Sequence, residues 1–357
     1  MTHSNTASIP EKLPLSSFIS KPFYAELETR FMLRGKLEAE KLKSLVLPYT
    51  GVPKDSIIVP PQLGEDAAVI KVPHTNMVIA SDPITGAIDN IGMYVINVNA
   101  NDVACMGAAP EYFLSVILLP EGLADDHIEK IASDISKEAE KLNISIVGGH
   151  TEALPLESPI VVGTMVGFTD KVITSSGAQL GDHIILTKGA AIEGTSILAT
   201  DLYHILQKKV DISVLEKAKP FLNSISVVKE ALIAREYATA MHDPTEGGIQ
   251  GALHELADAS GTGFQVDIDK IPLAKETATI CSALNINPLK LISSGSLLIT
   301  VPQERSLVLK ETLRKAGIIA EIIGEITKER NLEPVVQDEL WRVLEELDSN
   351  HSGGHLH

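Results

Sequence analysis

Aromatic residues and cysteines are scarce in this sequence, and each scarcity excludes a class of structure. Phe, Trp and Tyr together make up 4% of the 357 residues, so the hydrophobic cores must be built from Val, Ile, Leu and Ala. Such cores favour parallel or mixed sheets covered by helices. The two cysteines, Cys105 and Cys281, are far apart and have no Cys or His at metal-ligand spacing. We therefore expect no disulfide framework and no zinc site, but two small buried side chains in a reducing cytoplasm.

Positive charge and long apolar runs are also lacking. The formal net charge of -17 argues against a nucleic-acid partner, because phosphate backbones are bound by clustered Lys and Arg. It does not exclude a nucleotide, since carboxylates can hold Mg²⁺ and the metal can hold phosphates. The longest apolar stretches, such as Phe113–Leu119 and Leu297–Val301, are strand-sized, and the N-terminus lacks a signal-peptide core. We expect a cytoplasmic protein without a membrane or nucleic-acid partner.

The length and composition predict two α/β domains. A chain with 44% hydrophobic and 22% charged residues is typical of globular proteins, and 357 residues exceed one ordinary core. The small residues Ser175–Ala178 separate two series of elements, and we place the domain boundary near residues 170–181. The predicted organisation is an N-terminal extension and helix (1–45), a first domain (46–175), a second domain (176–340) and a polar tail (341–357).

Short strand-like runs alternate with longer helical patterns along both halves. In the first half, strands are predicted at Ser56–Val59, Ala67–Val72, Met77–Ser81, Tyr112–Leu119, Ile144–Val147 and Ile160–Phe168, and helices at Phe18–Leu47, Ile91–Met106 and Asp125–Leu142. In the second half, strands are predicted at His183–Thr187, Ala238–Met241, Phe264–Ile268, Ser296–Val301 and Ala320–Ile323, and helices at Thr195–Glu236, Gly247–Ser260, Lys275–Leu284 and Glu304–Ala316. An acidic helix is expected after Trp341.

Four polar groups interrupt the apolar strands and helices of the first half. They are Gly64-Glu65-Asp66, Ser81-Asp82, Asn101-Asp102 and Gly148-Gly149-His150-Thr151-Glu152. Each has an ordinary structural explanation, as a turn, an Asx turn, a solvated helix face or a tight bend. Carboxylates that recur at strand ends are, however, how α/β enzymes assemble a hard-cation site. Together the four groups favour a Mg²⁺ and phosphate site.

The second half contains one strong local motif, His242-Asp243-Pro244-Thr245-Glu246-Gly247-Gly248, between a strand and a helix. Asp243 or Thr245 is predicted to cap the helix, and the glycines allow a ligand to approach the backbone closely. The helix N-terminus offers N–H groups to an anion. The alternative is an ordinary capped helix start. A second turn, Ser293–Ser296, is equally consistent with a ligand loop and a plain turn.

These motifs resemble one known superfamily. Gly64–Val69 resembles the Gly-Asp-Asp-Ala-Ala-Val signature of aminoimidazole-ribonucleotide (AIR) synthetase, thiamine-monophosphate kinase, selenophosphate synthetase and HypE. Asn101–Pro110 matches the helix signature Asn-Asp-(apolar)-Ala-x-x-Gly-Ala-x-Pro, and Gly148–Thr151 is similar to the Gly-Gly-Asp-Thr or Gly-Gly-His-Thr loop. Asp243–Gly248 resembles the Asp-Pro-Thr-Arg-Gly-Gly motif of HypE. The match covers about residues 45–330 in order, and the combination is far more specific than any single motif.

The resemblance implies an α/β, PurM-like fold of two domains, in which the N-terminal α/β domains dimerise through a shared β-barrel and ATP binds near that interface. It implies Mg²⁺ ligands at Asp66, Asp82 and Asp102. We expect catalytic roles for Asp66 and Asp102, and for His150 because an imidazole can carry a proton. The positions implied in ATP binding are Gly64, Ser81, Asn101, Gly148, Gly149, Thr151, Asp243, Thr245, Gly247 and Gly248.

Three departures from the HypE pattern affect the expected reaction. His150 stands where HypE and thiamine-monophosphate kinase usually have a metal-binding Asp, and it is expected to carry a proton or to hydrogen-bond a phosphate. Glu246 replaces the Arg of the HypE motif, which exchanges a cation for a carboxylate. HypE ends in a cysteine that is carbamoylated and then dehydrated, whereas this sequence ends in His357 with no cysteine after Cys281.

The predicted function is therefore an ATP-dependent, HypE-like enzyme that activates an amide or carbonyl oxygen by phosphorylation, in hydrogenase or metallocofactor maturation. Its acceptor is an unknown small or protein-bound molecule, and a maturation-protein partner is expected. One alternative is a small-molecule kinase similar to thiamine-monophosphate kinase. The other is a non-enzymatic, nucleotide-binding maturation scaffold.

Overall fold

The structure is a computed structural model that describes residues 39–52, 54–85 and 90–352, with side chains described as far as Leu347. The predicted N-terminal arm, most of the predicted helix Phe18–Leu47 and the last residues of the tail lie outside these residues. Helix α1 (Ala39–Leu45) is the described part of that predicted helix. The described residues all belong to one compact unit.

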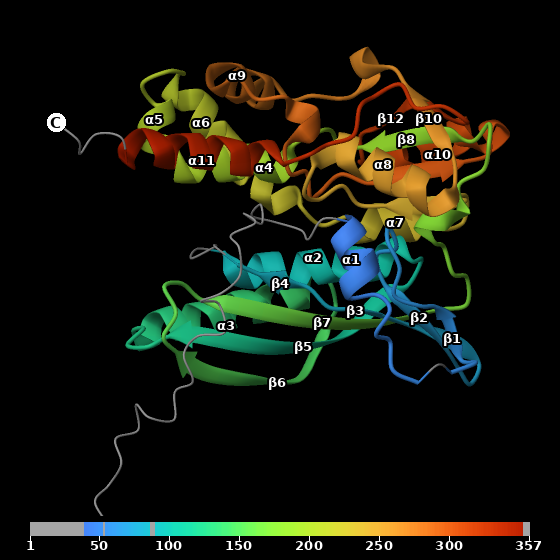
Figure 1. Cartoon of the computed structure of the whole chain (residues 1–357), viewed down its shortest axis with the longest axis horizontal. Coiled ribbons are helices and arrows are strands. Elements are labelled where there is room, and N and C mark those ends of the chain that lie inside the picture. The colour runs from blue at the N-terminus through green and yellow to red at the C-terminus, as the bar shows by residue number, and fades with distance from the viewer. Residues whose placement is uncertain (1–38, 53, 86–89, 353–357) are drawn as a thin grey trace, which may run out of the picture. The chain divides into compact units, whose positions relative to one another are not determined.

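The first half of this unit is built on a seven-stranded sheet (Figure 1). The strands are β1 (Ile57–Val59), β2 (Ala68–Val72), β3 (Thr75–Ala80), β4 (Pro83–Ile84), β5 (Ala109–Pro120), β6 (Ser145–Leu154) and β7 (Ile160–Thr169). Their order is β1-β2-β3-β7-β5-β6, with β4 beside β7. Only the pairing of β5 with β6 is parallel among the pairings of this described sheet.

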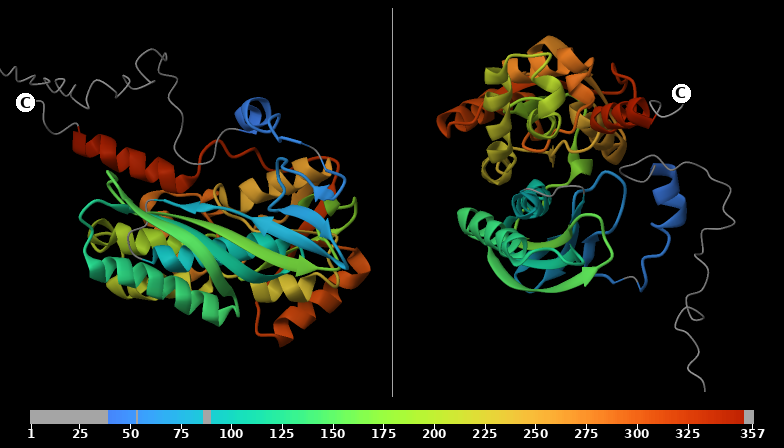
Figure 2. Two further views of the ribbon diagram at one scale, coloured as in Figure 1. Left: turned by 90° about the horizontal axis from the view of Figure 1, so that it is seen from below. Right: turned by 90° about the vertical axis from the view of Figure 1, so that its left-hand side faces the viewer.

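Helices α2 (Ile91–Cys105) and α3 (Asp125–Lys141) cover one face of the sheet. Figure 2 shows both helices on the concave side of the curved sheet, between the sheet and the second half of the chain. Helix α3 buries Ile131, Ile135 and Ala139, which recur every four residues and form one apolar stripe. Helix α2 is buried almost all round because the sheet lies on one side of it and the second half of the chain on the other.

The second half is built on a five-stranded antiparallel sheet in the order β10-β12-β8-β11-β9. Its strands are β8 (His183–Thr187), β9 (Ala240–His242), β10 (Gly263–Val266), β11 (Leu298–Val301) and β12 (Ala320–Thr327). Its helices are α4 (Ile192–Asp201), α5 (Tyr203–Leu206), α6 (Ile212–Ala218), α7 (Val228–Ala234), α8 (Gly248–Ser260), α9 (Lys275–Leu284), α10 (Gln303–Lys315) and α11 (Glu339–Ser352).

One hydrophobic cluster runs through both halves. It contains Val103 of α2 and Phe113 of β5 together with Ala231 of α7 and Ile299 of β11, and all four are fully buried. Residues on the other face of the second sheet form a separate cluster with α8. The two halves therefore share a core at α2, and side chains from both can meet there. Among the described residues, no helix is both long and apolar enough to cross a membrane.

The predicted elements are found, the short strand β4 was not predicted, and two predicted segments differ in extent. The helical stretch Thr195–Glu236 is divided into α4, α5, α6, a 3₁₀ turn and α7, and Pro220 lies in that turn. The strand predicted at Ile144–Val147 begins at Ser145 as β6, which continues to Leu154, so Gly148–Thr151 is strand rather than a bend or loop. The residues of β6 are exposed as far as Ala153. Gly149 lies so close to β5 that a Cβ there would collide with the carbonyl oxygen of Ser115.

Candidate active site

Carboxylates from both halves meet at the C-terminal end of α2. Asp66 follows the turn before β2, Asp102 lies in the last turn of α2, and Asp243 directly follows β9. The side chain of Asp66 is 6% exposed, and Asp102 and Asp243 are 6% and 2% exposed. Asp82, which follows β3, hydrogen-bonds Asp102. The structure thus brings together the three predicted Mg²⁺ positions and adds Asp243.

The electrostatics of this acidic cluster (Asp66, Asp82, Asp102 and Asp243) favour a bound cation. Burial raises the pKa of Asp102 well above its usual range, and the neighbouring charges of Asp82, Asp243 and Asp66 raise it further. The Oδ2 atom of Asp102 is buried without a hydrogen-bond partner. A buried carboxylate without compensation costs several kcal/mol. Oxygen-rich clusters of this kind suit Mg²⁺, so the residues fit the ion that the resemblance implies.

His242 links two carboxylates and fixes one member of the cluster. Its Nδ1 lies 2.5 Å from Oδ1 of Asp66, and its Nε2 lies 2.9 Å from Oε2 of Glu255 on α8. Burial opposes a charge on His242, but Asp66 and Glu255 raise its pKa well above the ordinary value. The Oγ of Ser175 donates to the other oxygen of Asp66 at 3.3 Å. Asp66 is therefore oriented by groups outside the first sheet.

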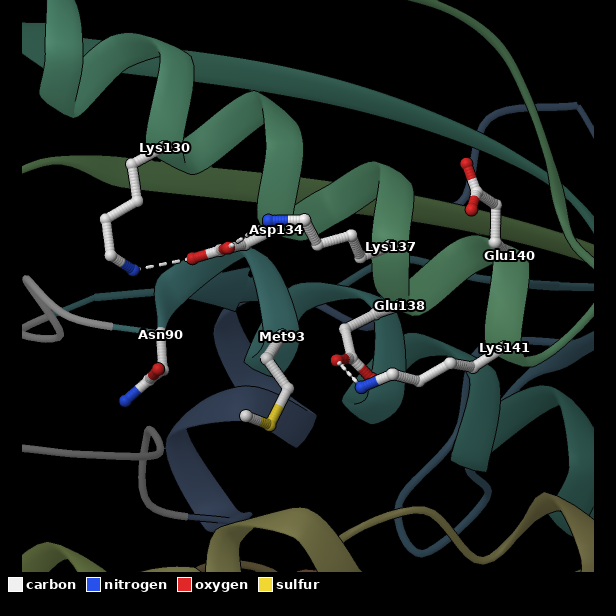
Figure 3. Close-up of a pocket in the computed structure, with 8 residues that line it drawn as sticks. All are labelled: Asn90, Met93, Lys130, Asp134, Lys137, Glu138, Glu140 and Lys141. Carbon is white, nitrogen blue, oxygen red and sulfur yellow. Dashed lines mark hydrogen bonds and ion pairs between the residues drawn. The ribbon is translucent and has the colours of Figure 1, made fainter.

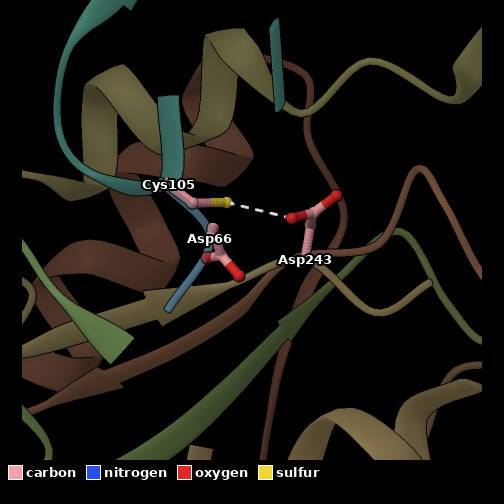
Figure 4. Close-up of side chains that lie close together, drawn as sticks. All are labelled: Asp66, Cys105 and Asp243. Atoms are coloured by element: carbon pink, nitrogen blue, oxygen red, sulfur yellow. Dashed lines mark hydrogen bonds between the residues drawn. The ribbon is translucent and has the colours of Figure 1, made fainter. Parts of the chain in front are cut away.

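Cys105 also reaches the acidic cluster. It lies three residues after Asp102, on the same side of α2, and its Sγ donates to Oδ1 of Asp243 at 3.5 Å. One ligand atom from each of Asp66, Cys105 and Asp243 lies within 4.8 Å of the others (Figure 4). As predicted, both cysteines are buried and neither forms a disulfide.

Asn101 joins the two halves through hydrogen bonds. Its Nδ2 donates to the carbonyl oxygen of Ile225 at 2.9 Å, and its Oδ1 accepts from the N–H of Val227 at 2.8 Å. The side chain is fully buried. The structure thus gives Asn101 a role in holding the second half against α2, which differs from the nucleotide contact expected from the sequence.

His150 and its neighbours on the glycine-rich strand β6 are not part of the acidic cluster. His150 pairs with the exposed Val116, whereas the buried Ser115 pairs with Gly149. Since side chains alternate along strands, His150 points to the face of the sheet opposite α2. Its side chain is 64% exposed, and its nearest charged partner is Glu152, at 3.8 Å. The hydroxyl of Ser81 forms a hydrogen bond with the hydroxyl of Thr164. Thr164 pairs with Leu114 of β5, so it lies on this same face of the sheet, opposite α2.

Two glycines of the predicted ATP site are required by close approaches. A Cβ at Gly64 would lie 2.8 Å from the carbonyl oxygen of Glu255 on α8. Gly248 has a φ of +64° and would bring a Cβ to 2.6 Å from two carbonyl oxygens, of Leu289 and Leu291. Both glycines therefore allow α8 to pack closely against its neighbours.

The N-terminus of α8 is arranged differently from the prediction. Neither Asp243 nor Thr245 caps the helix; the N-cap is Gly247, with a φ of +87°. The N–H of Gly247 donates to Oδ2 of Asp338 at 2.6 Å, and Asp338 also accepts from the N–H of Leu340. A carboxylate of the chain itself thus occupies this anion position. Sequence patterns could not reveal it, because Asp338 lies 91 residues after Gly247.

Glu193 was also missed by the sequence analysis. It lies in the first turn of α4, is 5% exposed, and its Oε2 has no hydrogen-bond partner. Ser294 donates to this carboxyl group from its hydroxyl and its N–H. Burial raises the pKa of Glu193 to about 7, and nearby Asp338 adds to the effect. Burial raises the pKa of Tyr94 on α2, and the charge of Glu193 raises it further, so Glu193 lies within electrostatic range of α2.

An open groove of about 560 Å³ lies elsewhere, between α2 and α3 (Figure 3). Its charged side chains largely satisfy one another, since Lys130 pairs with Asp134 at 2.6 Å and Lys141 with Glu138 at 2.5 Å. None of the predicted site residues lines it. We therefore assign the site to the acidic cluster, where the Oδ2 of Asp102 is buried without a hydrogen-bond partner.

Family comparisons agree with the motif pattern. A family model described as AIR synthase related protein, N-terminal domain, matches residues 64–169, and one described as AIR synthase related protein, C-terminal domain, matches residues 179–337. A protein of Methanocaldococcus jannaschii named for hydrogenase expression and formation is 28% identical over 83% of this chain and 89% of its own length.

Two further relatives represent two branches of this superfamily. Carbamoyl dehydratase HypE of Azotobacter vinelandii is 28% identical over 74% of this chain and 80% of its own length. Thiamine-monophosphate kinase of Pyrococcus horikoshii is 27% identical over 68% of this chain and 78% of its own length.

Solved structures share the fold. The hydrogenase maturation protein HypE in complex with ATP aligns with a TM-score of 0.59 and 22% identity, over 86% of this chain and 90% of that one. A HypE–HypF complex aligns with a TM-score of 0.63 and 18% identity, over 76% of this chain and 91% of that one.

Proposed function

This chain belongs to the AIR synthase related family, and from this membership we propose that it is a Mg-ATP-dependent enzyme that phosphorylates the oxygen of an amide or carbonyl acceptor. The observation that carries the proposal is the buried acidic cluster, to which both halves of the chain contribute. A metal–nucleotide site would explain why four carboxylates gather here although His242 is the charged partner of only one of them, Asp66.

Mg²⁺ held by Asp66, Asp82 and Asp102 would neutralise charge on the ATP phosphates, which is a large part of catalysis in phosphoryl transfer. The protein's own residues place these ligands. His242 and Ser175 hold Asp66 in one orientation. Asn101 fixes the second half against α2, so that Asp243 faces the ligands of the first half. The chain therefore pre-organises the carboxylates before the nucleotide binds.

The acceptor is proposed to lie between the acidic cluster and Glu193. Tyr94, which is near Glu193, precedes Asp102 by eight residues on α2, a rise of about 12 Å. The unpartnered Oε2 of Glu193 suits a ligand that donates an N–H. An amide offers both that N–H and an oxygen to phosphorylate.

The carboxyl groups at and around Glu193 disfavour an anionic acceptor such as a phosphate ester. Asp338 lies near Glu193, and Glu246 lies near Asp338. Trp341 donates to Glu246 at 3.2 Å. Carboxylates at these positions repel a phosphate. This acidic surrounding favours the amide-activating branch over a kinase that acts on a phosphate ester.

We further propose that two copies pair through the open face of the first sheet. Tyr112, Leu114 and Val116 project from β5 on the face opposite α2, and each is about 40% exposed. The edge of β6 has no strand beyond it in the described sheet, and closing such an edge in a barrel removes a site of unwanted pairing. His150 would then lie at the interface.

The names of the relatives support a role in hydrogenase or metallocofactor maturation, with a maturation protein as partner.

ATP turnover with candidate acceptors tests this proposal. Purified protein should release ADP slowly with Mg-ATP alone and at least tenfold faster with an amide or carbamoyl compound. Glu193→Gln should reduce the stimulation by the amide while leaving Mg-ATP affinity within about twofold. Stimulation by a phosphate ester but by no amide would support the kinase alternative. Binding of ATP without any turnover would support the scaffold.

A further inference from the structure

Cys105 occupies an unusual position for a structural cysteine, because it lies among carboxylates. Its side chain is fully buried. Apart from burial, which comes first, the groups that raise its pKa are Asp243, Asp66 and Asp102. A buried thiol that serves only to fill space is normally surrounded by apolar groups. The three ligand atoms of Asp66, Cys105 and Asp243 lie within 4.8 Å of one another (Figure 4).

The geometry matches that of a metal with sulfur and oxygen ligands. In tetrahedral zinc sites the metal–sulfur distance is about 2.3 Å and the metal–oxygen distance about 2.0 Å, which places sulfur and oxygen about 3.5 Å apart. The Sγ of Cys105 lies 3.5 Å from Oδ1 of Asp243. These two atoms could therefore bind one ion without backbone movement.

A second observation points to a cation at this place. The Oδ2 of Asp102 is buried without a hydrogen-bond partner, and the carboxyl group is 6% exposed. The charge of Asp102 raises the pKa of Cys105, so Asp102 lies in the same cluster as Cys105. The charged neighbours that perturb Asp102 and Cys105 are all carboxylates. His242 is the charged partner of Asp66, and a divalent cation would compensate the charge that remains.

We propose that Asp66, Cys105 and Asp243 form a second metal position, which binds a thiophilic divalent transition metal such as Zn²⁺ or Co²⁺ beside the Mg²⁺ position at Asp66, Asp82 and Asp102, so that the Asp66 carboxylate is shared by the two positions. Binding forms a sulfur–metal bond and releases the thiol proton to solvent. Thiolate ligands favour such metals over Mg²⁺, which prefers oxygen. The ligands come from three distant segments, and for this reason cysteine spacing gave no sign of the site.

The site would also hold the two halves of the chain together. Asp66 and Cys105 belong to the first half, whereas Asp243 follows β9 in the second. A metal that binds the folded chain but not the unfolded chain stabilises the folded state by about 2.7 kcal/mol when the free metal concentration is a hundredfold above its dissociation constant. The inference does not depend on ATP turnover, because metal binding is observable by itself.

Cobalt titration tests the proposal. Full-length protein, freed of metal by a chelator, is titrated with Co²⁺ and followed by near-ultraviolet absorption, where a thiolate-to-cobalt charge-transfer band reports a sulfur–metal bond. The wild type should give this band with one Co²⁺ per chain, and Cys105→Ser should abolish it. Cys281→Ser is the matched control, because Cys281 is also buried (2% exposed) and has only Glu339 as a charged neighbour; it should keep the band.

The results of the cobalt titration can overturn the proposed second metal position in three ways. A wild type without the band, or a band that survives Cys105→Ser, overturns the proposal. If Cys105→Ser does not fold, Asp243→Asn replaces it and should weaken Co²⁺ binding at least tenfold; unchanged binding overturns the proposal. Mg-ATP binding is measured on the same samples. Normal Mg-ATP binding without the cobalt band refutes the second metal position alone, whereas the band without Mg-ATP binding refutes the proposed nucleotide function alone.

Discussion

Replacing Glu193 by Gln should change how stability depends on pH. Burial raises the pKa of Glu193 from 4.5 in the unfolded chain to about 7 in the folded protein. The folded state therefore holds its proton more tightly than the unfolded state. Stability from this group is fully present below pH 4.5, decreases as the pH rises toward 7, and is lost above that value. A Gln at this position carries no titratable proton.

The magnitude follows from the size of the change in pKa. A rise from 4.5 to about 7 corresponds to about 3 kcal/mol in total. Between pH 5 and pH 7.5, wild-type protein should lose about 2 kcal/mol of unfolding free energy through Glu193. The variant should not lose this part. The Gln amide adds a buried donor near Ser294, which costs roughly 1–3 kcal/mol, but this cost is the same at both pH values.

Urea unfolding of both proteins at pH 5 and pH 7.5 measures the effect. The difference in unfolding free energy between Glu193→Gln and wild type should shift by about 2 kcal/mol in favour of the variant at pH 7.5. Glu304→Gln is the matched control, because Glu304 also lies in the first turn of a helix, α10, but is exposed. A difference that stays constant for Glu193→Gln, within about 0.5 kcal/mol, would refute the assignment of a buried, protonated carboxyl group.

Three further predictions concern the rest of the site. Asn101→Ala should cost about 3 kcal/mol in urea unfolding, because it leaves a buried carbonyl and a buried N–H without partners; a loss below about 1 kcal/mol would contradict its role in joining the halves. Leu114→Lys combined with Val116→Lys should produce a folded monomer in light scattering, since charges disfavour burial of the open face, and a dimer that persists would exclude this interface. His150→Ala should leave the acidic cluster and its proposed metal sites intact, so Co²⁺ affinity should change less than twofold; a larger change would mean that His150 reaches the cluster.

Local patterns were sufficient to predict most of the fold. Helix α9 was predicted at Lys275–Leu284 and has these bounds, and α3 differs by one residue at its C-terminus. Both have clear periodicity, so neighbouring residues determine their structure. Strand β6 extends beyond its prediction because its parallel pairing with β5 continues past Gly149. That pairing is a long-range contact, and two glycines suggested a bend.

The candidate site was predicted only in part, because most of its contacts are long-range. The resemblance indicated Asp66, Asp82 and Asp102, and the structure places them together. Their roles, and the domain boundaries near residues 170–181, remain predictions. The partners that surround them come from distant segments. Asp338 reaches α8 from 91 residues away, and His242 reaches Asp66 across 176 residues. Such contacts depend on the packing of the two halves, which no local spacing encodes.

The most direct test of the central claim is calorimetric titration of Mg-ATP into the double variant Asp66→Asn, Asp102→Asn. Wild-type protein should bind ATP only with Mg²⁺ present. The double variant should lose at least a hundredfold in affinity, about 2.7 kcal/mol, because it lacks two of three proposed ligands. The matched control, Asp125→Asn with Asp126→Asn, removes two exposed charges from the first turn of α3 and should bind like wild type. Unchanged Mg-ATP affinity in a folded Asp66→Asn, Asp102→Asn protein would contradict the claim that this acidic cluster holds the metal–nucleotide complex.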